Sequence, residues 1–215
     1  MFEIKSLPMN ILEENCYIIS DETGEGIVID CGALYEKDRQ SIIQYVEERR
    51  LVIKHHICTH MHYDHCFGAA FMYETFHTAP EFHPSDEPIY KGEGDSIFGT
   101  LRQMMRNSQL PEAGRYLNEG DKVQFGNHSL SVLNTPGHTP GGICLYCAEE
   151  KVLFSGDTLF QCSIGRTDFP GGNADLLCEN IRKKLFTLPD DVMVYPGHGT
   201  YTNIGFEKQH NPYVY

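Results

Sequence analysis

The sequence predicts a mixed α/β protein, and three observations favour this class. Short apolar runs rich in isoleucine and valine recur along the chain, bounded by glycine, aspartate or proline, as β-strands often are. Longer segments between some of these runs carry apolar residues at helical spacing among charged ones. The first strands follow one another without a helix between them, which does not fit a pure repeat of strand, helix and parallel strand.

Eight apolar runs are interpreted as strands. They cover residues 2–7, 16–20, 26–32, 52–59, 128–135, 142–147, 151–156 and 191–197. Several cysteines lie inside these runs, and we expect them to be small core residues. They are Cys16, Cys31, Cys58 and Cys144.

Four segments are interpreted as helices, at residues 36–50, 67–76, 96–108 and 173–188. The first carries an apolar stripe formed by Ile42, Ile43 and Val46, with Tyr45 at its edge. The last opens at Asn173, a candidate N-cap. Its apolar positions at helical spacing are Leu176, Leu177, Ile181 and Leu185.

Length and composition predict one domain spanning residues 1–215, because a chain of 215 residues with 40% hydrophobic and 22% charged residues can bury a sizeable core. Residues 85–120 are more polar and are broken by glycine, so they are interpreted as an insertion or lid-like segment within that domain.

The charge balance limits the classes of partner. Acidic residues outnumber basic ones by 30 to 17, for a net charge of -13, which argues against nucleic acid or an anionic membrane as partner, because phosphate binding depends on Lys and Arg. No apolar run approaches the roughly 18 residues of a membrane span, and the first residues lack a secretory pattern. We therefore expect a cytoplasmic protein whose eight cysteines are reduced, with its oligomeric state left open.

A dense group of metal-binding side chains follows the run at 52–59. The stretch "HMHYDH" contains His60, His62, Asp64 and His65. Three later runs each end in a turn where glycine precedes one such side chain, and these are His138, Asp157 and His198. Functional loops commonly lie at strand ends, and glycine allows sharp turns there, so the repeated pattern predicts one shared site. The other six histidines have no partner at ligand spacing and are expected at the surface or in the core: His55, His56, His77, His83, His128 and His210.

The ligand spacing favours two metal ions over one. In an extended segment His60, His62 and Asp64 would point to one side, and a turn at Asp64 would direct His65 toward a second centre. Seven candidate ligands exceed the need of one tetrahedral zinc but suit two metals that share a bridging carboxylate and a bridging water. Two divalent metals about 3.5 to 4 Å apart lower the pKa of that water and polarise a substrate oxygen. The predicted chemistry is hydrolysis, with zinc as our first choice and iron or manganese as alternatives.

The motifs "THMHYDH", "TPGHTPGG", "FSGDTLF" and "YPGHGT", in this order, make residues 10–200 resemble the metallo-β-lactamase-fold hydrolases. The resemblance implies an αββα sandwich, in which two mixed sheets are flanked by helices and the metals lie at one edge. It implies that His60, His62 and His138 hold a first metal. A second metal would be held by Asp64, His65 and His198, with Asp157 bridging the two.

The stretch "SIGRTDF" and the tail "TNIGFEKQHNPY" are similar to the short bacterial glyoxalase II-like group, the hydroxyacylglutathione hydrolase-like proteins. This resemblance implies cleavage of a small-molecule thioester, such as S-2-hydroxyacylglutathione, by a metal-bridging hydroxide. Asp64 would act both as a ligand and as the group that orients the water. Glyoxalase II itself has a C-terminal helical domain that contacts glutathione. We expect no such domain here, which leaves open whether glutathione is the thiol.

Other functions remain open at this point. The "GRTD" loop also resembles persulfide dioxygenases, which use a single iron, and a lactonase or a non-catalytic metal-binding protein is a further alternative. Arg166 is a candidate partner for a substrate carboxylate, although an internal salt bridge with Asp168 explains it equally well. Tyr63 and Phe67 are candidates for the pocket wall, and core packing is as good an account of both.

Overall fold

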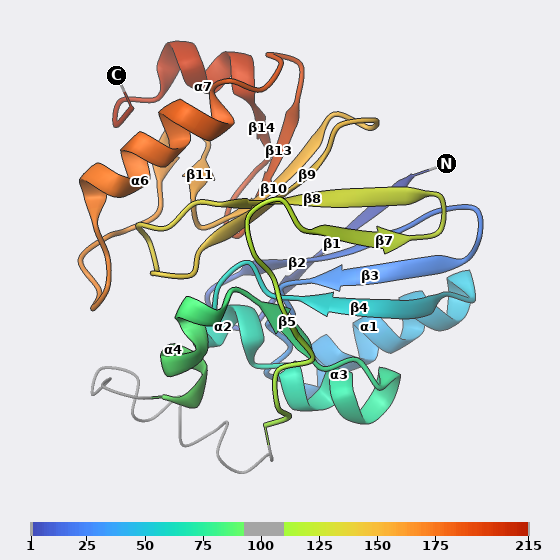
Figure 1. The fold of residues 1–215 in the computed structure, drawn as a ribbon. Helices are drawn as coiled ribbons and strands as arrows, with labels where there is room; N and C mark the ends of the chain where they lie inside the picture. Colours follow the sequence, from blue (N-terminus) through green and yellow to red (C-terminus); the bar gives the residue numbers. More distant parts are fainter. Residues whose placement is uncertain (1, 93–109, 215) are drawn as a thin grey trace.

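Two six-stranded β-sheets packed face to face form the centre of the computed structural model, which describes residues 2–92 and 110–214 (Figure 1). Helices cover the outer side of each sheet, so the layers run helix, sheet, sheet, helix. The αββα sandwich expected from the sequence is confirmed.

The first sheet has the strand order β1-β2-β3-β4-β5-β6. Its strands are β1 Glu3–Met9, β2 Glu14–Ser20, β3 Glu25–Ile29, β4 Val52–Ile57, β5 Pro80–Phe82 and β6 Arg115–Tyr116. The first three strands pair antiparallel, as expected for strands joined by short turns. From β3 onward the pairing is parallel, so this sheet is mixed.

The second sheet has the strand order β14-β13-β10-β9-β8-β7, and only β10 and β13 pair in parallel. Its strands are β7 Lys122–Phe125, β8 His128–Asn134, β9 Ile143–Cys147, β10 Val152–Gly156, β13 Met193–Pro196 and β14 Thr202–Asn203. A separate small hairpin follows β10. It is formed by β11 Leu159–Phe160 and β12 Ser163–Ile164.

The helices form the two outer layers. On the side of the first sheet lie α1 Glu36–Arg49, α2 Tyr63–Cys66, α3 Ala69–Phe76 and α4 Glu87–Lys91, the last preceded by a 3₁₀ turn at Pro84–Asp86. On the side of the second sheet lie α6 Ala174–Asn180, which continues as a π-helical turn at Ile181–Leu185, and α7 Ile204–His210. Asn173 caps α6 as predicted, because its side chain accepts a hydrogen bond from the amide of Leu176.

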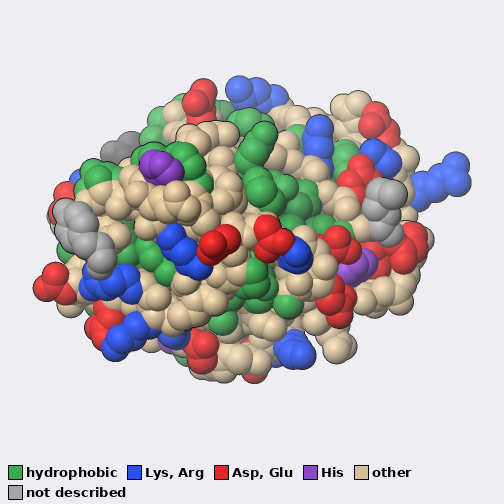
Figure 2. Space-filling view, turned by 90° about the horizontal axis from the view of Figure 1, so that it is seen from above, with side chains coloured by type: hydrophobic (Ala, Val, Ile, Leu, Met, Phe, Trp, Pro, Cys, Tyr) green, Lys and Arg blue, Asp and Glu red, His purple; other side chains and the backbone are tan. Residues whose placement is uncertain are grey.

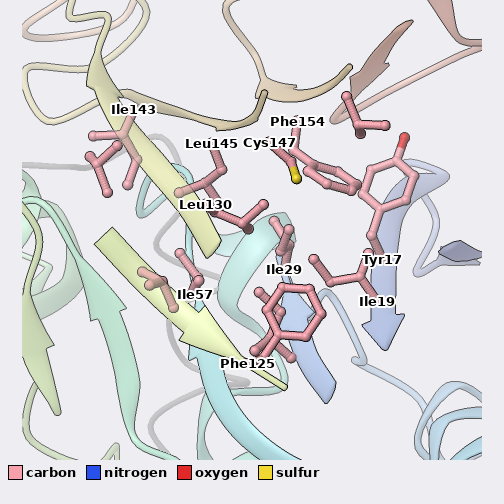
Figure 3. Close-up of a cluster of buried hydrophobic side chains, with 14 of the residues drawn as sticks. Tyr17, Ile19, Ile29, Ile57, Phe125, Leu130, Ile143, Leu145, Cys147 and Phe154 are labelled. Atoms are coloured by element: carbon pink, nitrogen blue, oxygen red, sulfur yellow. The ribbon is translucent and has the colours of Figure 1, made fainter. Parts of the chain in front are cut away.

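The main core lies between the two sheets, where side chains from both point toward one another (Figure 3). On β2, Tyr17 and Ile19 join this core, while Cys16 and Ile18 pack against the outer helices. Both faces of the strand are buried, which explains why its sequence is a continuous apolar run and not an alternating one. The cysteines expected in the core are buried, and all eight cysteines are free thiols.

The structure differs from the sequence interpretation at several elements. The stripe on α6 is narrower than expected, because Leu177, Ile181 and Leu185 are buried whereas Leu176 is 38% exposed. The helix predicted at 96–108 lies outside the described residues, as does the middle of the insertion or lid-like segment predicted at 85–120. The described ends of that segment form α4 and β6.

Among the described residues, no helix has the length and apolar content that a membrane crossing requires. On the face seen from above, basic and acidic side chains are interspersed and are not gathered into one basic patch (Figure 2).

Candidate metal centre

Four strand ends bring the candidate ligands to one edge of the sandwich. β4 leads into the loop of His60 and His62, β8 into that of His138, β10 into Asp157, and β13 into His198. β10 and β13 are parallel, and β8 and β10 both lie antiparallel to β9. The carboxyl ends of β8, β10 and β13 therefore meet at one edge, where β4 of the facing sheet also ends.

His60, His62 and His138 form a first cluster of ring nitrogens. His138 Nε2 lies 2.9 Å from His62 Nδ1 and 3.2 Å from His60 Nε2. Nδ1 of His138 donates a hydrogen bond to the carbonyl oxygen of Arg166, which leaves Nε2 with a free lone pair in the neutral ring. Burial lowers the pKa of His60 well below its ordinary value and that of His62 to about 3, so both rings are held in the neutral form that binds metal.

Asp64, His65 and His198 form a second cluster. Asp64 Oδ2 lies 3.2 Å from His198 Nε2 and 3.6 Å from His65 Nε2. The chain turns into α2 at Tyr63, and Asp64, in the first turn of this helix, lies beside His65 and His198. The alternation expected for an extended segment therefore ends at His62. The two triads implied by the family resemblance are two of the four overlapping groups of potential metal ligands among the described residues.

Asp157 lies between the two clusters. Its Oδ2 atom is 3.5 Å from His138 Nε2 and 3.9 Å from His198 Nε2, while its Oδ1 atom is 3.5 Å from His65 Nε2. One carboxylate thus faces histidines of both groups, which is the arrangement that a bridging ligand requires.

The polar groups of the second cluster fit a cation. His65 Nε2 and Asp157 Oδ1 are both buried without a hydrogen-bond partner, and they face one another. Burial opposes the charged form of His65, but Asp64, Asp157 and Asp30 outweigh it and raise the pKa of the ring to about 10. Burial likewise opposes the charged form of Asp64, yet the charges of His65 and His198 hold its pKa below its ordinary value. Buried carboxylates of this kind need a positive charge, which a divalent metal would supply.

Glycines allow the close approach of the loops, as the sequence predicted. A Cβ on Gly156, which has a φ of +48°, would lie 2.2 Å from Thr59 Oγ1. A Cβ on Gly197 would lie 2.4 Å from Asp157 Oδ1 and 2.6 Å from His65 Cε1. No other residue type fits these two positions without moving the site.

Two polar groups that orient the site were missed in the sequence. Asp30 follows β3 and accepts hydrogen bonds from the amide and hydroxyl of Thr59, each at 2.7 Å, and from His65 Nδ1 at 3.1 Å. It lies inside the apolar run at 26–32, directly after Ile29, and lacks the preceding glycine that marks Asp157. The second group is the carbonyl oxygen of Leu12, which accepts a hydrogen bond from His198 Nδ1 at 3.1 Å. Every residue has a backbone carbonyl, so the sequence alone does not show which one contacts His198.

The candidate substrate contacts differ in burial, because two are buried and one is exposed. Tyr63 and Phe67 are buried in the cluster that also contains Phe82 and Tyr90, so core packing accounts for both. Arg166 is exposed, forms two hydrogen bonds of 2.7 Å with Asp168, and lies over the ring of Phe169.

None of the other six histidines enters the groups of potential metal ligands found among residues 2–92 and 110–214. His55 pairs with Glu81, His128 lies between Asp21 and Glu150, and His210 stacks on Phe206. His56 is fully buried on β4.

Comparison with known proteins identifies the family. The model of the metallo-beta-lactamase superfamily matches residues 10–198. The chain belongs to this superfamily. A hydroxyacylglutathione hydrolase, GloC, from Haemophilus influenzae is 36% identical over 98% of this chain and 97% of its own length. The superfamily consists mostly of metal-dependent hydrolases, and the His and Asp clusters described above could hold the metal ions that this fold binds.

Solved structures of the superfamily match over nearly the whole chain. The BLEG-1 B3 metallo-beta-lactamase has a TM-score of 0.85 at 33% identity and covers 100% of this chain and 99% of its own. TTHA1623, solved in a di-iron-bound form, has a TM-score of 0.80 at 31% identity and covers 98% and 100%. ETHE1 from Myxococcus xanthus has a TM-score of 0.78 at 31% identity and covers 98% and 83%.

Proposed function

We propose that this member of the superfamily is a dinuclear hydrolase of small-molecule thioesters, with S-2-hydroxyacylglutathione as the first candidate substrate. The observation that carries the dinuclear part is the position of Asp157, whose carboxylate faces His138 of the first cluster and both His65 and His198 of the second. The similarity to the Haemophilus influenzae hydroxyacylglutathione hydrolase, over nearly the full length of both chains, supports the thioester part.

The residues would divide the work as follows. His60, His62 and His138 would hold one metal, Asp64, His65 and His198 the other, and Asp157 would bridge them. Zinc is the first candidate, with iron or manganese as alternatives. Metals bound there would supply a water acidic enough to attack at neutral pH and a Lewis acid for the carbonyl oxygen.

Asp64 is the candidate for orienting the attacking water. The charges of His65 and His198 hold the pKa of Asp64 below its ordinary value, and a bound metal would take the place of those charges, so the carboxylate stays ionised and can accept a hydrogen bond from a water molecule. Asp64 Oδ2 contacts His198, whose side chain is 28% exposed, so this cluster is open to solvent. His198 is fixed from behind by the Leu12 carbonyl, which keeps Nε2 directed at the carboxylates.

The central test is an assay of metal-loaded protein on S-lactoylglutathione, other thioesters, homoserine lactones, a β-lactam and glutathione persulfide, combined with metal analysis. We expect about two metals per chain and the highest kcat/KM on a thioester. His60→Ala and Asp157→Ala should lose metal and hydrolysis together. An Asp157→Ala variant that kept both metals and full activity would overturn the proposal of a shared site.

The structural similarity to ETHE1 keeps the persulfide dioxygenase as the second candidate function, and the same experiment separates the two. A single bound iron, with oxygen uptake on glutathione persulfide, would establish that alternative in place of thioester hydrolysis. Metal binding without turnover of any substrate in the panel would leave the non-catalytic metal-binding protein.

A further inference from the structure

Asp86 is a buried carboxylate that joins two of the loops around the first cluster. It lies at the end of the turn before α4 and is 0% exposed. Its Oδ2 atom accepts a hydrogen bond from the amide of Met61 at 3.1 Å and from the hydroxyl of Thr139 at 2.8 Å. Its Oδ1 atom accepts one from the amide of Gly141 at 2.6 Å.

The positions of these donors in the sequence give Asp86 its significance. Met61 stands between His60 and His62, and Thr139 directly follows His138. The carboxylate thus contacts the backbone between two histidines of the first cluster and the residue next to the third. It does not touch an imidazole, so any effect on the cluster acts through the two loops.

The fit around the carboxylate is close. A Cβ on Gly141 would lie 2.7 Å from both Cγ and Oδ1 of Asp86, so only glycine lets the second loop come this near. Hydrogen bonds to an ionised acceptor are stronger than those between neutral groups, and three of them offset much of the cost of burying the carboxylate. Loss of the carboxylate would leave the Met61 and Gly141 amides buried without this partner.

We propose that Asp86 is a positioning residue of the first metal centre, which holds the loop of His60 and His62 against the loop of His138. The assignment rests on the proposed function in one respect, namely that these three histidines bind a metal. Side chains that orient metal ligands from outside typically change metal affinity by about 10- to 100-fold when they are replaced.

Asp86→Ala tests the assignment through zinc affinity, measured on the full chain by competition with a chromophoric chelator. We expect the zinc of the first centre to bind at least about tenfold more weakly and its occupancy to recover at high free zinc. Asp86→Asn, which keeps the side-chain volume and one carbonyl acceptor, should give a smaller loss, and it serves if the alanine variant does not fold.

Asp21 provides a matched control. It is also buried, and it accepts hydrogen bonds from the amides of Thr23 and Asn127 and from the Thr23 hydroxyl. Asp21 follows the end of β2 that is distant from the metal centre. At the other end of this strand, the backbone of Glu14 pairs with that of His198 in an isolated antiparallel β-bridge. Asp21→Ala should lower the free energy of unfolding and leave both zinc affinities unchanged.

A double-variant comparison separates a local effect from a general one. In the His62→Ala background the first centre is already lost, so adding Asp86→Ala should not change the affinity of the remaining zinc. Unchanged affinities in Asp86→Ala would overturn the assignment alone, as would an equal loss of zinc in Asp21→Ala. A wild-type chain that binds no zinc, iron or manganese would overturn the proposed function itself.

Discussion

His138 Nδ1 donates a hydrogen bond to the carbonyl oxygen of Arg166 over 2.6 Å, so the "GRTDF" loop orients a ring of the first cluster through its backbone. The side chain of Arg166 has different contacts, because it pairs with Asp168 and lies over the ring of Phe169. The contribution of this residue to the site can therefore be divided into a backbone part and a side-chain part, and each part can be tested by its own substitution.

Gly165→Ala tests the backbone part. A Cβ at this position would lie 1.8 Å from the carbonyl oxygen of Asp157 and 3.2 Å from the His138 ring, so the loop must move and the Arg166 carbonyl must leave His138. We expect zinc to bind about tenfold more weakly or worse, as when an outer hydrogen bond to a metal-binding histidine is lost. Chelator competition measures the change.

Arg166→Ala is the companion variant, because it keeps the backbone carbonyl and removes only the exposed side chain. Zinc affinity should stay at the wild-type value. If the guanidinium also binds a substrate carboxylate, KM rises with little change in kcat. An unchanged KM would leave the salt bridge with Asp168 as its role. Equal loss of zinc in both variants would contradict the division between backbone and side chain.

The residues that could be predicted from the sequence share a local pattern. His138, Asp157 and His198 each follow a glycine at the end of an apolar run, and the strands that precede them end at one edge of the sandwich. Asp86 has no such pattern. It lies in a polar segment, and its partners are 25 to 55 residues away, so only the packing of the fold reveals its position.

The missed elements have similar physical causes. β5, β6 and β14 contain two or three residues each, too few for an apolar period to be visible. Leu176 and Leu177 both fit helical spacing, but neighbouring residues on a helix differ by about 100° in direction, so only one of them can face the sheet. Leu177 lies four and eight residues before Ile181 and Leu185, on the same stripe, so it is the one that packs against β10 and β13.

The stability of the protein should depend on pH through His56. Burial lowers the pKa of this ring to about 3, while the unfolded chain has the ordinary value of about 6.5. Below pH 6.5 the unfolded state therefore binds more protons than the folded state, and stability falls by about 1.4 kcal/mol for each pH unit down to the folded pKa. His56→Leu removes this titrating ring and should weaken the dependence of stability on pH.

Urea unfolding at pH 6.5 and pH 5, with a chelator in all samples, measures the difference. From pH 6.5 to pH 5 the free energy of unfolding of the wild-type chain should fall by about 2 kcal/mol more than that of His56→Leu. His77→Asn is the control, because His77 is exposed in a left-handed conformation that asparagine tolerates, and it should follow the wild type. Parallel pH dependence in the wild type and His56→Leu would show that the buried ring does not titrate as expected.

Glu207, in the tail stretch "GFEKQHNP", should be a structural anchor. It is fully buried on α7 and accepts hydrogen bonds from the Thr202 hydroxyl at 2.6 Å, the Cys162 amide at 3.0 Å and the Asn211 side chain at 2.9 Å. Cys162 lies in the turn of the β11–β12 hairpin, and this hairpin leads into the "GRTDF" loop. The tail therefore holds this hairpin in place, which gives Glu207 and Asn211 a physical role independent of substrate.

Glu207→Ala leaves buried donors without a partner, and we expect it to lower the free energy of unfolding by about 3 kcal/mol. Hydrogen exchange of the Cys162 amide should accelerate more than that of amides on β2, because the hairpin loses its anchor while the sheet core does not. Lys208→Ala is the neighbouring control. Its ammonium group pairs with Asp190, whose side chain is 71% exposed, and the loss should be about 1 kcal/mol or less. Equal destabilisation by the two variants, or unchanged exchange at Cys162, would show that the tail does not hold the hairpin.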